Sequence, residues 1–245
     1  KENNSNKLTS LQLRLAPFIL RRTKAEVARE LPKKNEIIKI IELTEQQANV
    51  YESIRITMTD EIRKAVRNQQ ANQILISNAL LRLRQVCCHP ALLKLDTVKA
   101  PESAKLDWLS MAVPNLVEEG RKILIFSSFT SMLQIIADKM DELGIEYFKL
   151  TGATQPHKRT EQIDAFQAGN APVFLISLKA GGAGINLTAA DTVIHFDPWW
   201  NPAAEQQASD RAHRIGQDKQ VFVYKLITHG TVEEKIHKLQ LQKQQ

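Results

Sequence analysis

The sequence of 245 residues predicts an α/β fold, in which a mostly parallel β-sheet has helices on both faces and follows an all-helical region. Three observations predict it. After residue 120, short runs of apolar, β-branched or aromatic residues recur, as in parallel strands that are buried on both faces. Helical patterns separate these runs. Before residue 100, apolar residues recur at helical spacing instead.

The region 1–100 is predicted to be helical. The segment 44–70 has no Gly or Pro, and apolar residues recur at every fourth position on one helical face: Val50, Ile54, Met58, Ile62 and Val66. Thr44 and Gln47 resemble a capping box at its start. A second helix is expected from about 72 to 88, ending before the next proline. The segment 13–34 is predicted to form helices broken at its two prolines.

The region 101–230 is predicted to form the sheet, and 231–245 a C-terminal helix. A helix over about 103–119 leads into the first strand. The predicted strands are 122–127, 146–150, 173–177, 192–197 and 220–227. The helices expected between and after them are 131–143, 156–168, 202–214 and about 231–243.

The composition is that of a globular protein, with 43% hydrophobic and 24% charged residues. No apolar stretch is long enough for a membrane span. The polar start of the chain reads as a frayed end or as the point where a longer protein was cut. The net charge of +6 permits a polyanionic partner, although a slightly basic protein without one fits equally well.

Only two cysteines occur, Cys87 and Cys88, and His89 follows them. This cluster suggests a metal site, but no second ligand pair has zinc-like spacing. Neighbouring cysteines also rarely pair with each other. We therefore expect no metal and two buried, reduced thiols in an intracellular protein.

Ligands of an open α/β sheet bind at the carboxyl ends of its strands. The residues to inspect are therefore those that follow Ser127, Leu150, Ser177, Asp197 and Ile227. Three unusual stretches fall there, and each has a second, purely structural interpretation.

The first stretch is SLKAGGAGINLTAAD, residues 177–191. Its glycines permit positive φ and close approach of a ligand, and successive backbone N–H groups can form an anion nest. The phosphate-loop pattern G-x-x-x-x-G-K-[ST] does not occur in the chain. A tight turn with close packing is the alternative.

The second stretch is EQQASDRAHRIGQ, residues 205–217. On the predicted helix, Gln207, Arg211 and Arg214 share one face. Guanidinium groups are well suited to bind phosphate. The alternative is a solvated charged face paired with Asp210 or Glu205.

The third stretch is HFDPWWNP, residues 195–202. If it is extended, Trp199 and Trp200 cannot both face the core, so at least one is a candidate stacking surface or interface residue. The alternative is one core tryptophan and one that packs under a loop.

The stretch 174–217, which contains all three, closely resembles the fifth and sixth motifs of Swi/Snf-type ATPases. ILIFSSFT (123–130) is similar to their fourth motif. Three further segments resemble family stretches in the right order: PFILRRTKAEVARELPKK (17–34), LRQVCCHPALL (83–93) and SAKLDWL (103–109), where Ala104 replaces the usual Gly. The WWNP run resembles the bacterial branch of the family.

The resemblance implies two RecA-like lobes that face each other across a cleft for ATP and Mg²⁺, with double-stranded DNA along the other side. This chain resembles the second lobe. Residues 1–100 would be the end of the first lobe with protrusion and linker helices. The phosphate loop and the acidic Mg²⁺ motif do not occur in the chain. We therefore expect this chain alone not to hydrolyse ATP.

Site residues also follow from the resemblance. Arg211 and Arg214 would be arginine fingers that reach the γ-phosphate. The nucleotide cleft would include Gln207, Gly182, Gly184 and Asn186. Positions near the DNA backbone would be Ser127, Thr151, Gly152, Arg159, Ser177 and Lys179, with Trp200 beside them.

The implied function is ATP-driven translocation on double-stranded DNA that remodels or displaces protein–DNA complexes. The implied partners are duplex DNA, the first lobe and a DNA-bound protein such as RNA polymerase, with no membrane. A bacterial protein would be cytoplasmic and associated with the nucleoid, and a eukaryotic one nuclear. The alternatives are a strand-separating DNA or RNA helicase lobe and a degenerate nucleic-acid-binding scaffold.

Overall fold

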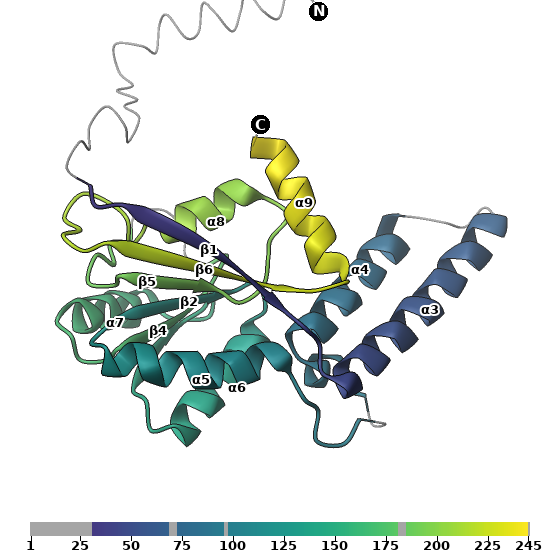
Figure 1. The fold of residues 1–245 in the computed structure, drawn as a ribbon, viewed down its shortest axis with the longest axis horizontal. Coiled ribbons are helices and arrows are strands. Elements are labelled where there is room, and N and C mark those ends of the chain that lie inside the picture. Colours follow the sequence, from purple (N-terminus) through teal and green to yellow (C-terminus); the bar gives the residue numbers. More distant parts are fainter. Residues whose placement is uncertain (1–30, 69–72, 96–97, 181–184, 245) are drawn as a thin grey trace, which may run out of the picture. The chain divides into compact units, whose positions relative to one another are not determined.

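The computed structural model describes residues 31–68, 73–95, 98–180 and 185–244. They contain a six-stranded sheet with the order β1-β6-β5-β2-β4-β3, and every neighbouring pair is parallel (Figure 1). The strands are β1 (Lys34–Ile41), β2 (Ile123–Ser127), β3 (Tyr147–Leu150), β4 (Val173–Ser177), β5 (Thr192–His195) and β6 (Val221–Thr228). The predicted α/β class and parallel sheet are confirmed.

Helices cover both faces of the sheet, as predicted. The helices are α3 (Glu45–Arg67), α4 (Gln73–Cys88), α5 (Ala104–Glu118), α6 (Thr130–Glu142), α7 (Pro156–Gln167), α8 (Pro202–Ser209) and α9 (Val232–Gln244), with the short 3-10 helix η1 (Pro90–Leu93) after α4. On one face, α5 and α6 pack on alternate residues of β2 and β4. On the other, Phe166 of α7 and Ala208 of α8 pack on the intervening residues. None of the described helices is long and apolar enough to cross a membrane.

The strand β1 corrects the expectation of an all-helical region 1–100. It pairs with β6 over its whole length, from Lys34 opposite Val221 to Ile41 opposite Thr228. Its pattern escaped detection because an edge strand needs only one neighbour. Ile41 is buried, but Ile38 and Ile40 stay exposed, so no clear alternation of apolar and polar residues results. In space the sheet therefore begins within the region predicted to be helical.

The helices α3 and α4 form an antiparallel pair beside the sheet (Figure 1), and the predicted helices 44–70 and 72–88 are confirmed. The backbone N–H of Gln47 donates to Thr44 Oγ1 (3.1 Å), as half of the expected capping box. The side-chain amide of Gln47 instead donates to the carbonyl of Val86 in α4 (2.7 Å). This contact fixes α3 against the end of α4, where both pack on α9.

Candidate functional site

The carboxyl edge of the sheet holds most of the site residues predicted from the sequence. One part of this edge is a cluster of arginines around the turn that follows β4. The helix α8 ends at Ser209, so the prediction of a helix over 202–214 was wrong at its end. Arg211 and Arg214 lie in the turns that follow, rather than on one face of a helix with Gln207.

Side-chain and cross-segment contacts explain why the helix ends. The carbonyl of Arg211 accepts a hydrogen bond from the N–H of Leu187 (3.0 Å), and the carbonyl of Ala212 accepts one from the amide of Gln217 (2.9 Å). The same amide donates to the carbonyl of Ala190 (2.7 Å). Of the backbone acceptors that a longer helix would use internally, that of Arg211 is thus bound by the segment after β4 and that of Ala212 by the side chain of Gln217. This segment and the arginine turn form one unit.

Arg211 is buried without a counter-charge. Its side chain is 5% exposed, and its Nε has no hydrogen-bond partner within the described part of the chain. Burial, followed by the positive charges of Arg159 and Arg214, lowers the pKa of Arg211. No ion pair joins Arg211 to any acid among residues 31–68, 73–95, 98–180 and 185–244. The simplest explanation for a buried cation of this kind is that an anion binds beside it.

The other two arginines bind the backbone on either side of the glycine-rich turn. Arg159 of α7 donates to the carbonyl of Ala180 (2.9 Å), and Arg214 donates to that of Ile185 (3.3 Å). The structure therefore brings Arg159, which was grouped with the DNA-contacting residues, next to Arg211. Gly182 and Gly184 lie outside the described residues. Gln207 and Asn186 are both exposed.

The residues predicted near DNA fall into two groups. Thr151 is half-buried, and Gly152 and Lys179 are exposed. Ser127 and Ser177 are 1% and 4% exposed, and both side chains have partners within the protein. Ser127 Oγ donates to Asp197 (2.6 Å), and Ser177 Oγ accepts from the N–H of Ala180 (3.2 Å). These buried hydroxyls hold the turns in place, and the proximity of Ser127 and Ser177 to the DNA backbone stays a prediction.

The two tryptophans have different environments. The ring centroid of Trp199 lies 5.0 Å from the guanidinium carbon of Arg84, and the backbone N–H of Trp199 donates to Glu205 Oε1 (2.7 Å). Trp200 is half-buried and packs on the apolar cluster that joins α3, α4 and α9. Trp200 therefore packs within the protein and Trp199 contacts Arg84, while the place of Trp200 beside DNA stays a prediction.

Sequence reasoning missed the centre of this edge. Asp197 receives hydrogen bonds from Ser127 Oγ, from the N–H and hydroxyl of Ser128, and from Arg84 of α4. Arg84 is 4% exposed. One signal was present in the sequence: Arg84 precedes the buried Cys88 by four residues and so lies on the buried face of α4.

The cysteines and His89 have structural environments. Cys87 and Cys88 are both free and buried, and burial raises the pKa of Cys87 to about 12. His89 Nδ1 accepts from the N–H of Ala91 (3.2 Å) and caps η1. Among the described residues, no three His, Cys, Asp or Glu side chains are grouped to hold a metal ion.

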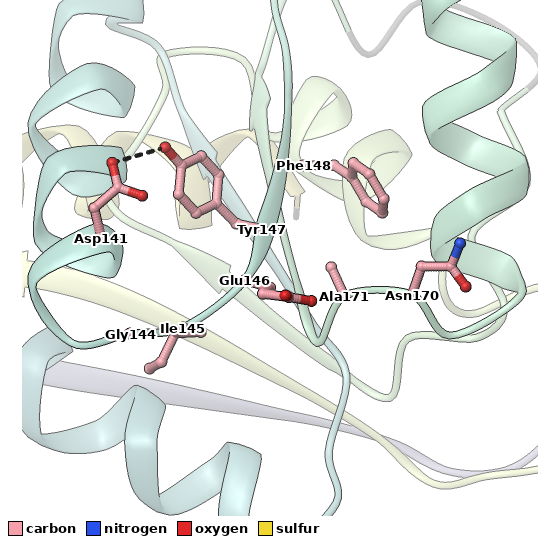
Figure 2. A pocket seen from close by; sticks show the side chains of 8 residues that line it. All are labelled: Asp141, Gly144, Ile145, Glu146, Tyr147, Phe148, Asn170 and Ala171. Atoms are coloured by element: carbon pink, nitrogen blue, oxygen red, sulfur yellow. Dashed lines mark hydrogen bonds between the residues drawn. The ribbon is translucent and has the colours of Figure 1, made fainter.

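An open pocket of about 610 Å³ lies at the opposite edge of the sheet (Figure 2). It surrounds the amino end of β3, and the hydroxyl of Tyr147 points to Asp141 at its wall (3.2 Å). None of the predicted site residues lines it. This pocket is therefore separate from the candidate site.

Comparisons with known proteins relate this parallel α/β lobe to helicase domains. The helicase conserved C-terminal domain matches residues 104–216, and the SNF2-related domain matches 1–92. YwqA of Bacillus subtilis, a putative ATP-dependent helicase/translocase, is 40% identical over 242 residues, which are 96% of this chain and 26% of YwqA. The chain spans about a quarter of the length of the curated relatives it matches.

Two solved structures extend the comparison. The SWI2/SNF2 ATPase C-terminal domain of Sulfolobus solfataricus is 34% identical, with a TM-score of 0.71 over 86% of this chain and 87% of that one. The SWI2/SNF2 ATPase core from the same organism, in complex with double-stranded DNA, is 37% identical, with a TM-score of 0.73 over 96% of this chain and 50% of that one. The chain belongs to the SWI2/SNF2 ATPase family and includes its RecA-like C-terminal lobe.

Proposed function

We propose that this chain is the second motor lobe of an ATP-driven translocase that moves along double-stranded DNA and remodels or displaces protein–DNA complexes. The observation that carries the proposal is the buried, uncompensated guanidinium of Arg211 beside Arg159 and Arg214. The duplex DNA in the Sulfolobus core supports the DNA part of the proposal, and the similarity to YwqA, a putative ATP-dependent helicase/translocase, supports the translocase part.

The arginine cluster suits a phosphate group of ATP that is held mainly by a first lobe. Negative charge spreads over phosphoryl oxygens in the transition state, and a planar guanidinium stabilises it with two parallel hydrogen bonds. Mg²⁺ would supply further charge neutralisation at the phosphates. No cluster of carboxylates suited to this ion occurs in the described residues, so its ligands would come from the first lobe. This chain contributes the arginines and the turn that holds them.

Duplex DNA would bind mainly through phosphate contacts on the same carboxyl edge. Exposed Lys179 and the Thr151–Gly152 turn are available for such contacts. Binding of this kind does not depend on base sequence and weakens steeply with salt. A DNA-bound protein would be the object that translocation displaces.

The experiment compares Arg211→Ala and Arg214→Ala with the parent in a protein that has both lobes. Arginine fingers contribute about 10³–10⁵ in rate. We expect each variant to lower kcat for DNA-stimulated ATP hydrolysis at least about a hundredfold, a cautious discount on that range. ATP affinity and DNA binding without nucleotide should change far less. Lysine at either position should restore little activity, because it lacks the planar guanidinium that makes two parallel hydrogen bonds.

Single-turnover kinetics and a nucleotide-binding assay provide the measurements, and Arg82→Ala on the exposed side of α4 is the matched control. Near-parental rates in both variants would show that the arginines have no catalytic part. A parent that hydrolyses ATP without any response to duplex DNA would contradict the proposed function itself.

A further inference from the structure

Arg84 connects the helical pair to the carboxyl edge of the sheet. It lies near the end of α4, and its side chain reaches the turns that follow β2 and β5. One terminal nitrogen donates to Ser128 Oγ (2.7 Å) and lies 3.3 Å from Asp197 Oδ2. The side chains of Arg84 and Asp197 are 5% and 0% exposed. A buried ion pair of this kind fixes a geometry strongly, because either charge alone would be costly to bury.

Two aromatic rings hold the guanidinium of Arg84. Its central carbon lies 4.9 Å from the ring centroid of Phe129 and 5.0 Å from that of Trp199. These distances suit cation–π contacts. Phe129 belongs to the turn after β2, and Trp199 to the turn after β5. The arginine therefore contacts both turns by charge and by stacking.

The turn with Trp199 is attached to other elements of the lobe as well. Glu205 of α8 accepts a hydrogen bond from the backbone N–H of Trp199, and Gln240 of α9 donates one to the carbonyl of Trp199. Lys105 of α5 donates to the carbonyl of Phe196 (2.7 Å), just before Asp197. The turn between β5 and α8 thus receives contacts from α4, α5, α8 and α9. Arg84 is its polar link to the helical pair, beside the apolar packing of Trp200 on the same helices.

The contacts of Arg84 are also incomplete. Its Nε is buried and has no partner among the described residues, although the carboxylate of Asp197 is close. An arginine with a purely structural role is expected to satisfy its buried donors. A small shift of the Trp199 turn would change how the fork meets the carboxylate. The geometry therefore suits a link whose strength depends on the position of this turn.

We propose that Arg84 is a positioning residue that couples the helical pair α3–α4 to the Ser128 and Trp199 turns, so that bound DNA can accelerate ATP hydrolysis. The inference rests on the proposed function. It assigns Arg84 no contact with ATP. Its loss should leave hydrolysis without DNA in place and remove the acceleration by DNA.

The test uses a protein with both lobes and measures kcat for ATP hydrolysis with and without saturating duplex DNA. For Arg84→Met we expect the rate without DNA to stay within about twofold of the parent, and the stimulation by DNA to fall at least about tenfold. Arg84→Lys should lose most of the stimulation too, because lysine keeps the charge but lacks the planar fork. The control is Arg82→Met, an exposed arginine on the same helix, which should match the parent.

Asp197→Asn tests the other side of the link. It should reduce stimulation similarly, and the double variant with Arg84→Met should lose little more than either single variant, since both remove one interaction. Melting curves accompany each rate. If Arg84→Met fails to fold, Arg84→Lys decides the question by the same ratio.

Parental stimulation in a folded Arg84 variant would overturn the inference. An equal fall of both rates with a lowered melting temperature would also overturn it, because Arg84 would then act only through stability. A parent with no response to DNA would contradict the proposed function first, which keeps the two failures distinct.

Discussion

Arg84 and Arg211 are two buried arginines at the same edge of one sheet, and their surroundings differ in kind. They are 4% and 5% exposed. Arg84 faces the carboxylate of Asp197 and two aromatic rings. Arg211 faces two other arginines, and within the described residues no acid pairs with it. Proteins bury an unpaired charge only at a cost, so the difference indicates which arginine has its counter-ion within the lobe and which requires one from outside.

Lys105, like Arg84, is a buried cation with a buried acidic partner. Its substitution has the largest expected effect on the free energy of unfolding. Its ammonium lies 2.7 Å from Glu233, and both side chains are 0% exposed. Breaking a buried pair by removing one partner costs about 3–5 kcal/mol. We expect Lys105→Met to lower the free energy of unfolding of this chain by about that amount, measured by denaturant titration. Lys158→Met, at an exposed site on α7, is the control. A loss below about 1 kcal/mol would show that the pair contributes little.

His195 is a buried imidazole that stays neutral in the folded chain, and this lowers the stability of the fold at acidic pH. Burial, followed by the charge of Lys225, lowers its pKa from 6.5 to about 3. Its Nε2 bonds Ser209 Oγ (2.9 Å) at the end of α8, just before the arginine turn. The unfolded chain takes up a proton at this histidine below pH 6.5, and the folded chain does so only near pH 3, so stability falls as the pH decreases between these values.

We expect this histidine to cost about 2 kcal/mol of stability at pH 5 relative to pH 8. His195→Gln should remove that share of the pH dependence, and His157→Gln at an exposed position should not. Denaturant titrations at the two pH values measure it. An unchanged pH dependence in His195→Gln would mean that the imidazole is accessible to protons in the folded state.

Substitution of Arg211 has the smallest expected effect on stability. It distinguishes a buried cation without an acidic partner from those that have one. Because its neighbours are cations, Arg211→Met should not lower the free energy of unfolding by more than about 0.5 kcal/mol, and relief of repulsion should favour a rise. Thermal and denaturant unfolding of this chain measure the change. A loss as large as that expected for Lys105→Met would identify Arg211 as a structural residue and remove the argument for an anion beside it.

Several elements were predictable from the sequence because their signals are local. The strands after residue 120 are near-continuous apolar runs, and all five expected there occur as β2 to β6 within a few residues. The long helix α3 followed from a four-residue apolar spacing, and its start from Thr44. The order of the motifs placed the chain in its family, since each motif is a contiguous run of residues.

The sequence by itself thus determined the α/β class, the family and the edge of the sheet where the candidate site residues lie, because periodicity and motifs depend on neighbouring residues. Only the tertiary structure decided that β1 joins the sheet, that α8 ends before Arg211, and that Ser127 binds Asp197 rather than facing solvent. These outcomes depend on contacts between distant segments, such as Leu187 with Arg211 and Arg84 with Asp197. The sign of the charge around a buried arginine is set by which segments fold against it, and no local pattern contains that information.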